Sequence, residues 1–423
     1  MGGPRRRPDH ERVAVTGLGV KCPAGCDPDA LWATLASGRS CAGPIERFDA
    51  SVLPARYRFA CEVHDFDPLD YFEFKEARRL DRVTQLGVAA AADALASAGA
   101  VDADPARCGV VAGTGVGGLM TLEEQHGVLV ERGSDRVSPM LVPMMMTNAT
   151  AAVVGMRLGW TGPNLCVATA CAAGTHSVGE GARLIRDGVA DVVLAGGTET
   201  CITPLAMSAF GRMGALSSRA EEPELASRPY DAERDGFVMG EGAGFLVLER
   251  WDRAVAREAR IWGEVLGYAR NSDAHHITAP VPGGAGAAAC MQAALADAGL
   301  EPTDVGHVNG HGTSTPLNDA AEAEAVVKVF GERGVPLTSN KGAIGHLVGG
   351  AGAVEAVASL LALDRAQIPP TANHTHPDPA LAVDVVAGAP RPAPPGPVVS
   401  NSFGFGGHNA SIVLALAEAE PRA

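Results

Sequence analysis

The chain has 423 residues, of which 46% are hydrophobic and 20% are charged, a composition typical of folded globular proteins. This length exceeds what one ordinary hydrophobic core needs, so two halves of similar size are expected. The formal net charge of -15 argues against a general nucleic-acid-binding protein, because such proteins present a basic face to phosphates. No apolar run reaches the roughly 18 residues of a membrane span, so no membrane association is expected.

The nine cysteines are scattered, odd in number and without a paired CxxC framework. The first residues, MGGPRRRPDHER, contain no apolar segment of the kind a secretory signal has. These features favour a reducing cytoplasm, with most cysteines buried and inert. Flexible tails are expected at residues 1–11 and 419–423.

The first half of the chain alternates short apolar strands with helices. Residues 12–20 (RVAVTGLGV) predict a buried strand, and a helix is expected between an N-cap at Asp27 and a stop near Gly38. Residues 81–100 predict a helix that is rich in Ala and Leu and ends at glycine. Short strands are expected at CGVVAG, at residues 191–200 and at residues 242–250.

A second series of elements begins near residue 255. WGEVLGYARNSDA predicts a strand, residues 284–300 predict a helix, and PVVSNSFGFGGHNASIVLALA predicts two strands that flank a glycine loop. Alternating strands and helices favour an α/β protein with helices packed on sheets. The start of this second series near residue 255 suggests that the chain has two comparable halves, at residues 12–255 and 256–418.

The stretch GTGVGG, at residues 113–118, matches the pattern G-x-G-x-x-G after a strand, which is typical of dinucleotide-binding folds. The residues that follow predict a helix but no second strand ending in an acidic residue. A tight turn with close packing is therefore the better interpretation of these glycines.

Two cysteines lie five residues apart in LCVATACAAGTHSVGEGARLI. Cys171 falls where a predicted strand passes into a helix, and backbone N–H groups at a helix N-terminus stabilise a thiolate and an oxyanion. Cys166 lies within the apolar run and is expected to be a small core residue. Position alone leaves both a catalytic and a structural role open for Cys171.

Two histidines in glycine-rich loops strengthen the catalytic interpretation. His311 lies in VNGHGTSTPLND, and His346 lies in SNKGAIGHLVGGAGAVE, with Lys341 five residues before it and Glu355 nine residues after it. Imidazoles that share glycine-rich loops with hydroxyls and a lysine form a better candidate catalytic site than isolated histidines do. The wide separations between Cys171, His311 and His346 give no metal-ligand spacing, so no metal is expected.

TACAAG, VNGHGTSTPLND, NKGAIGHLVGGAGAVE and NSFGFGGHN, in this order, resemble the β-ketoacyl-acyl carrier protein (ACP) synthases of the type II group, including type II polyketide ketosynthases. The resemblance covers residues 12–416. It implies a thiolase fold, with two similar halves in a five-layer α-β-α-β-α arrangement. It also implies a decarboxylative Claisen condensation that lengthens an ACP-bound acyl chain by two carbons, with no cofactor.

The same resemblance implies roles for individual residues. Cys171 would carry the acyl chain, while His311 and His346 would donate hydrogen bonds to the enolate oxygen. Lys341 would hold positive charge beside them and Glu355 would orient the lysine. The backbone N–H groups of Cys171 and Phe405 would bind the acyl oxyanion, and the ring of Phe405 would control access. The substrate would also contact Thr313, Thr315, Val116, Met140, Met144 and His276.

An acidic carrier protein needs a basic docking surface, although the net charge of the chain is negative. FKEARRLDR places Lys75, Arg78, Arg79 and Arg82 at helical spacing, and they are expected to form this surface. A merely solvated helix face is the alternative. Gly214 stands at a further position that is basic in relatives, where Arg212 or Arg219 could compensate.

The acyl pocket is expected to depart from that of relatives. RVSPMLVPMMMTNA contains four methionines, which are flexible and can adapt to unusual chains, and Val116 replaces a bulkier residue. A roomier pocket for an unsaturated or polyketide chain is one hypothesis, and ordinary packing at a subunit interface is the other.

Three further alternatives concern assembly and activity. The chain could act as a homodimer or as a heterodimer with a chain-length-factor-like partner in polyketide synthesis. A non-catalytic partner subunit would lack the nucleophile, but Cys171 is present. A thiolase acting on coenzyme A thioesters would need a second cysteine in the C-terminal glycine loop, where Phe405 stands instead.

Overall fold

The computed structural model describes residues 7–417, so the expected tails at residues 1–6 and 419–423 lie outside the described part. Arg7 forms an ion pair with Asp297 at 2.6 Å, which holds this part of the expected N-terminal tail against the body of the protein. No helix within residues 7–417 is long and apolar enough to cross a membrane.

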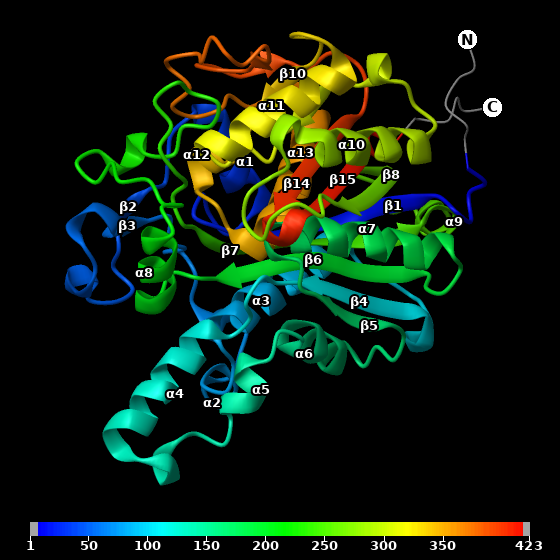
Figure 1. Cartoon of the computed structure of the whole chain (residues 1–423). Helices are drawn as coiled ribbons and strands as arrows, with labels where there is room; N and C mark the ends of the chain where they lie inside the picture. The colour runs from blue at the N-terminus through cyan, green and yellow to red at the C-terminus, as the bar shows by residue number, and fades with distance from the viewer. Residues whose placement is uncertain (1–6, 418–423) are drawn as a thin grey trace.

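The N-terminal half contributes five strands to one large sheet (Figure 1). Their spatial order is β5 (Asn164–Val167), β4 (Cys108–Gly113), β6 (Val192–Thr200), β7 (Glu241–Arg250) and β1 (Val13–Lys21). β4 runs parallel to β5 and β6, whereas β7 is antiparallel to β6 and β1. β5 is an edge strand, so one of its sides has no partner within the described chain.

The C-terminal half continues the sheet through a short pairing of β8 with β1, at Val15–Gly263 and Ala14–Glu264. Its strands follow in the order β8 (Gly263–Ser272), β15 (His408–Ala415), β14 (Val398–Gly404), β9 (His307–Asn309), β10 (Pro336–Thr338) and β12 (Asp384–Val385). Two small ribbons pair β2 (Gly43–Pro44) with β3 (Phe59–Ala60) and β11 (Gln367–Ile368) with β13 (Arg391–Pro392).

Helices cover both halves of the sheet and also fill the space between them. The inner layer contains α7 (Ala173–Arg186) and α13 (Ala351–Asp364), and every residue of α13 up to Leu363 is buried. One outer layer packs α3 (Arg82–Ala98) and α6 (Ala149–Leu158) on the first half, and the other packs α10 (Ala285–Ala298) and α11 (Pro316–Phe330) on the second. The predicted α/β architecture with five layers is confirmed.

The remaining helices differ in exposure, and the short α12 (Lys341–Ile344) is entirely buried. α4 (Leu119–Arg132) and α5 (Leu141–Met145) form an arm that projects away from the layers (Figure 1). The others are α1 (Pro28–Ser37), α2 (Phe74–Ala77), α8 (Pro204–Arg212), α9 (Trp251–Ala256) and α12 (Lys341–Ile344).

Local sequence accounts for several element boundaries. Asp27 caps α1 by accepting a hydrogen bond from the N–H of Ala30, and Gly38 ends this helix in the left-handed conformation with φ 65°. Asp81 caps α3 in the same way, through the N–H of Val83. The expected helix boundaries at these positions are therefore confirmed, because short polar and glycine residues satisfy the end groups of each helix.

Candidate active site

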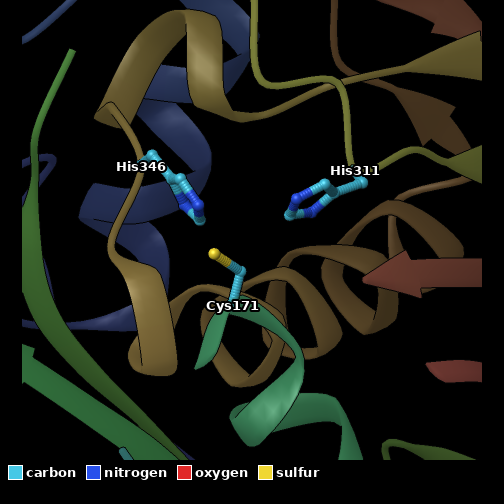
Figure 2. A group of neighbouring side chains, drawn as sticks. All are labelled: Cys171, His311 and His346. Atoms are coloured by element: carbon cyan, nitrogen blue, oxygen red, sulfur yellow. The ribbon is translucent and has the colours of Figure 1, made fainter. Parts of the chain in front are cut away.

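Cys171 lies in a sharp turn between β5 and α7. A single 3-10 turn spans Ala170–Ala172, and Ala170 takes the left-handed conformation with φ 49°, which is costly for a residue with a side chain. The Cys171 side chain is only 8% exposed and points toward His311 and His346 (Figure 2). The turn therefore presents one thiol to two imidazoles that come from distant parts of the sequence.

Burial dominates the protonation of this thiol. It raises the pKa of Cys171 to about 11, although the backbone N–H of Phe405 and the charge of Lys341 act in the opposite direction. The expectation that the helix N-terminus would favour a free thiolate is therefore wrong for this state of the protein, because desolvation outweighs the helix dipole. The thiol is neutral at pH 7 and needs a proton acceptor when it attacks.

The C-terminal glycine loop packs directly against the nucleophile. A Cβ at Gly404 would lie 3.1 Å from the nitrogen of Ala172 and 3.2 Å from the nitrogen of Cys171, so the close approach requires glycine here. The backbone N–H of the next residue, Phe405, faces the Cys171 sulfur. Two N–H groups thus converge where an oxyanion would form, as the sequence suggested.

The two histidines form one wall of the site. Their rings are 5.4 Å apart and nearly perpendicular, and their nitrogens lie within 4.8 Å of each other and of the Cys171 sulfur. Burial, assisted by the nearby charge of Lys341, keeps the pKa of both His311 and His346 well below the ordinary value. Both imidazoles are therefore neutral at pH 7.

Hydrogen bonding sets the tautomer of one imidazole. The backbone N–H of Val348 donates to Nδ1 of His346 at 3.3 Å, so the proton of this ring is on Nε2. Nδ1 of His311 is buried and has no partner among the described residues, so its proton can be on either nitrogen. His346 is thus a fixed donor, while His311 can exchange a proton.

Lys341 and Glu355 form a fully buried ion pair through Nζ and Oε1. Burial raises the pKa of Glu355, and the contact with the lysine ammonium counteracts that shift. The two residues are 14 positions apart in the sequence, and the structure brings the side chain of Lys341 on α12 to that of Glu355 on α13. The pair holds a positive charge close to both histidines.

A cavity of about 540 Å³ leads to the thiol. Val116, Phe210, Phe237 and Val348 give it apolar walls, and Thr313 and Thr315 lie on the polar side with their hydroxyls 2.8 Å apart. The structure thus places Val116, Thr313, Thr315 and Phe405 on the cavity wall, as expected from the sequence. This combination of an apolar wall and a polar channel suits an acyl chain that is attached to a long polar group.

Three predicted substrate contacts are not part of this wall. Among the described residues that line the cavity, Met140, Met144 and His276 are absent. Both methionines belong to the projecting arm around α5, and His276 is exposed, with Nδ1 accepting the N–H groups of Thr278 and Ala279. The methionines thus lie away from the described wall of the acyl cavity.

The predicted docking residues divide into two groups. Lys75, Arg78 and Arg79 are exposed on α2 and the turn after it. Arg82 instead begins α3 and turns inward, where it bonds the buried carboxylate of Glu241 at 2.8 and 2.9 Å. Its assignment to the docking surface is wrong, because a helix break at Asp81 separates it from the other three.

We expect substitutions of the inward-facing Arg82 and of the exposed Arg79 to differ in their effect on the free energy of unfolding. Arg82→Met is expected to lower the free energy of unfolding by about 2 kcal/mol, since the buried Glu241 loses a charged hydrogen-bond donor and keeps the ion pair with Arg47 and the N–H of Val63. Arg79→Met, on an exposed position, should leave that free energy within about 0.5 kcal/mol of wild type. Urea unfolding followed by circular dichroism compares the two, and equal stabilities would contradict this assignment.

Cys166 is not a core residue. It lies on the edge strand β5, is partly exposed, and its thiol contacts the carbonyl oxygen of Thr147 at 3.2 Å. Leu165 beside it is 47% exposed. The apolar strand β5 was predicted to be buried, but it is partly exposed because, in the described chain, it pairs with β4 alone.

A buried network that no sequence motif indicated supports His311. Glu322 on α11 accepts the N–H groups of His311 and Gly312 at 2.7 and 2.6 Å, and also the hydroxyl of Tyr230 at 2.8 Å. Asp319, one turn earlier, accepts the N–H of Tyr230 at 2.8 Å. Acidic residues at buried positions of an alanine-rich helix were the available signal.

The buried carboxyl group of Glu322 is expected to make the free energy of unfolding depend on pH. Burial raises its pKa from 4.5 to about 7, so the folded state keeps a proton that the unfolded state releases. Its contribution to the free energy of unfolding is therefore present below pH 4.5 and is lost as the pH rises to about 7, by on the order of 3 kcal/mol. Glu322→Gln should remove this component from urea unfolding measured across the window, and an unchanged pH profile would contradict it.

The same thiol and imidazoles are also a possible metal-ligand set, although their sequence spacing argued against one. Their donor atoms lie within 4.8 Å of one another, as do those of a second group, Asp231, Glu233 and His376. In the first group, the buried ammonium of Lys341 lies close enough to lower the pKa of both imidazoles and would repel a dication. In the second, Asp231 already accepts hydrogen bonds from Arg228, Thr375 and His376.

A buried thiol with two oxyanion donors, beside neutral imidazoles, defines a thiol acyltransferase site in a thiolase-type fold. Family models agree with this: "Beta-ketoacyl synthase, N-terminal domain" matches residues 10–254 and "Beta-ketoacyl synthase, C-terminal domain" matches residues 262–375. The chain therefore belongs to the β-ketoacyl synthase family, whose members are acyl-transferring condensing enzymes.

Individual relatives resemble the chain over nearly its whole length. A 3-oxoacyl-[acyl-carrier-protein] synthase 2 from Synechocystis sp. is 45% identical over 410 residues, which are 96% of this chain and 98% of the relative. The structure of the ishigamide ketosynthase/chain length factor matches with a TM-score of 0.89 at 36% identity, covering 96% and 99% of the two chains. A type II PKS acyl-carrier protein in complex with its ketosynthase (AntDE:AntF) matches with a TM-score of 0.88 at 31% identity, covering 96% and 99%.

Proposed function

We propose that the chain is a β-ketoacyl-ACP synthase that extends an ACP-bound acyl chain by two carbons, with malonyl-ACP as the donor. The observation that carries this proposal is the meeting of the Cys171 thiol with two neutral imidazoles and the Phe405 N–H at the end of one cavity. The relative named as a 3-oxoacyl-[acyl-carrier-protein] synthase and the similar ketosynthase in complex with a type II PKS acyl-carrier protein support a fatty-acid and a polyketide pathway, respectively.

In the first half-reaction, the thiol of Cys171 attacks the thioester carbonyl of the acyl-ACP. Because the pKa of the thiol is about 11, its proton passes to His311, whose Nδ1 has no partner among the described residues. The N–H groups of Cys171 and Phe405 hold the oxyanion. The tetrahedral intermediate collapses, and the departing phosphopantetheine sulfur takes the proton back from His311.

In the second half-reaction, malonyl-ACP loses carbon dioxide and becomes an enolate. His346 donates Nε2–H to the enolate oxygen, and Lys341 holds positive charge nearby. The enolate carbon attacks the acyl thioester on Cys171, and the carbon–sulfur bond breaks. A proton from solvent restores the Cys171 thiol, so the chain, the two substrates and this proton account for every atom of the step.

The carrier protein and a second ketosynthase-like subunit are the proposed partners. Lys75, Arg78 and Arg79 give an exposed basic surface for an acidic carrier protein. Large apolar side chains are exposed on the arm and on the neighbouring elements α6 and β5: Val130, Val142, Met156 and Leu165. These side chains support a paired subunit in either a homodimer or a heterodimer.

The proposal extends to the organisation and location of the protein. We propose two functional halves, with the nucleophile in residues 12–255 and both histidines in residues 256–418. All nine cysteines lie within the described residues and are free thiols, which supports a cytoplasmic enzyme.

Product analysis with defined donors tests the proposed reaction. The protein is incubated with hexanoyl-ACP and either malonyl-ACP or acetyl-ACP, and the carrier-bound products are measured by mass spectrometry. The proposal predicts a β-keto product two carbons longer with malonyl-ACP only. An equal yield with acetyl-ACP would indicate thiolase chemistry instead, and no product with either donor or with other acyl chains would contradict the proposal.

A further inference from the structure

A buried carboxylate next to the site has no part in the chemistry derived above. Glu199 lies near the end of β6 and is 0% exposed. It accepts four hydrogen bonds: from the hydroxyl of Thr114 at 3.0 Å and from the N–H groups of Gly115, Val116 and Gly349 at 2.5, 3.4 and 3.2 Å. Burial raises its pKa, while these donors favour the charged carboxylate.

The four donors belong to two segments that are more than 200 residues apart in sequence. The loop after β4 contributes Thr114, Gly115 and Val116, and the segment after His346 contributes Gly349, which directly follows Val348. Gly115, Val116 and Val348 all line the cavity that holds Cys171. Glu199 therefore joins two parts of the cavity wall from behind, without touching the cavity itself.

The two segments are packed so tightly that their positions depend on each other. A Cβ at Gly115 would lie 2.9 Å from a methyl carbon of Val348 and 2.7 Å from the Glu199 carboxylate. Val348 itself has φ 43°, a left-handed conformation that a β-branched residue adopts only when its surroundings impose it. The hydrogen bond from Gly349 to Glu199 is one of the contacts that impose it.

The histidine in the second segment has separate support. The N–H of His346 donates to the carbonyl oxygen of Val238 at 2.8 Å, independently of Glu199. Nδ1 of the His346 ring accepts the N–H of Val348, so the ring depends in part on this segment, whereas the backbone of His346 does not. Loss of the Glu199 contacts would therefore release Val116 and Val348 more than it would displace the backbone of His346. The consequence would appear in the fit of the acyl chain rather than in the decarboxylation of the donor.

We propose that Glu199 is a positioning residue that determines acyl-chain specificity, because its carboxylate fixes Val116 and Val348 as one wall of the acyl cavity. This inference rests on the proposed function and assigns a specificity role to a residue that does not contact substrate. A released wall accepts longer or bulkier chains more readily than the wild-type wall does.

The test is the ratio of kcat/KM for dodecanoyl-ACP to that for butanoyl-ACP, with malonyl-ACP as the donor. Glu199→Gln keeps the shape of the side chain but places an amide NH2 against backbone N–H groups. It should raise the ratio about tenfold in favour of the longer chain, while malonyl-ACP decarboxylation without an acyl primer stays within about twofold of wild type. Thr114→Val removes one of the four donors to Glu199, together with the acceptor of the Gly117 N–H, and should shift the ratio in the same direction by about threefold.

Glu62→Gln is the matched control. Glu62 is also buried and accepts two backbone N–H groups, from Glu46 and Arg47, but is not among the described residues that line the cavity. Its replacement should leave the ratio unchanged. An equal loss for both chains in Glu199→Gln and Thr114→Val, or an unchanged ratio in both, would overturn the inference. Failure of the wild-type protein to condense any acyl chain would instead overturn the proposed function.

Discussion

Cys171→Ala is expected to abolish acyl loading and to lower the rate of condensation about ten-thousand-fold, because Cys171 is the one cysteine among the described residues that line the cavity. His311, His346 and Lys341 are unchanged in this variant, so the enolate remains stabilised. Decarboxylation of malonyl-ACP should therefore continue at a rate near that of wild type. Carbon dioxide release and product formation, measured together, separate the two activities.

Cys166→Ala is the matched control for this experiment. Cys166 lies five residues earlier on the edge strand β5 and is more exposed than Cys171. It should retain acyl loading and condensation within about threefold of wild type. Loading that persists in Cys171→Ala and disappears in Cys166→Ala would contradict the assignment of the nucleophile.

Lys341→Met is expected to lower the free energy of unfolding by about 3–5 kcal/mol and to stop condensation. The substitution leaves the Glu355 carboxylate without a partner at a position that is fully buried. Burial already raises the pKa of Glu355, so the carboxylate should take up a proton more readily once the lysine ammonium is removed. Thermal or urea unfolding followed by circular dichroism measures the loss.

A double variant distinguishes charge from packing at this pair. Lys341→Met combined with Glu355→Gln removes both charges, so it should recover more than half of the stability lost in Lys341→Met. It should not recover condensation, because the positive charge beside His311 and His346 is still missing. A double variant with no more stability than Lys341→Met would contradict the assigned role of the ion pair.

Much of the fold could be predicted from sequence because local patterns and tertiary packing agree. The strand at residues 13–21, the capped helices after Asp27 and Asp81, and the paired strands around the C-terminal glycine loop all occur where expected. Each depends on short-range signals, namely apolar runs, side-chain caps and glycine. The five-layer arrangement followed from resemblance rather than from these signals.

The predictions for Arg82 and Cys166 were wrong because tertiary contacts determine whether these side chains are buried. Arg82 has the helical spacing of a docking residue, yet the buried carboxylate of Glu241 draws it inward across 159 positions of sequence. Cys166 has an apolar neighbourhood, yet its strand is at the edge of the sheet. Neither an ion-pair partner nor a strand order can be read from local composition.

The pKa of the nucleophile and the roles of the buried carboxylates likewise could not be predicted from the sequence. A helix N-terminus was expected to lower the pKa of Cys171, but the turn buries the thiol so deeply that desolvation prevails. Glu199 and Glu322 escaped notice because their function depends on backbone N–H groups from other segments, and the residue type alone does not reveal these donors.

Intact-mass measurement after a single exposure to acyl-ACP tests the central claim most directly. The wild-type protein should gain the mass of one acyl group, Cys171→Ala should gain none, and addition of malonyl-ACP should remove the group from the wild-type protein as a longer β-keto product. An acyl group that is retained after malonyl-ACP, or that is released only by water, would contradict the account of a condensing enzyme.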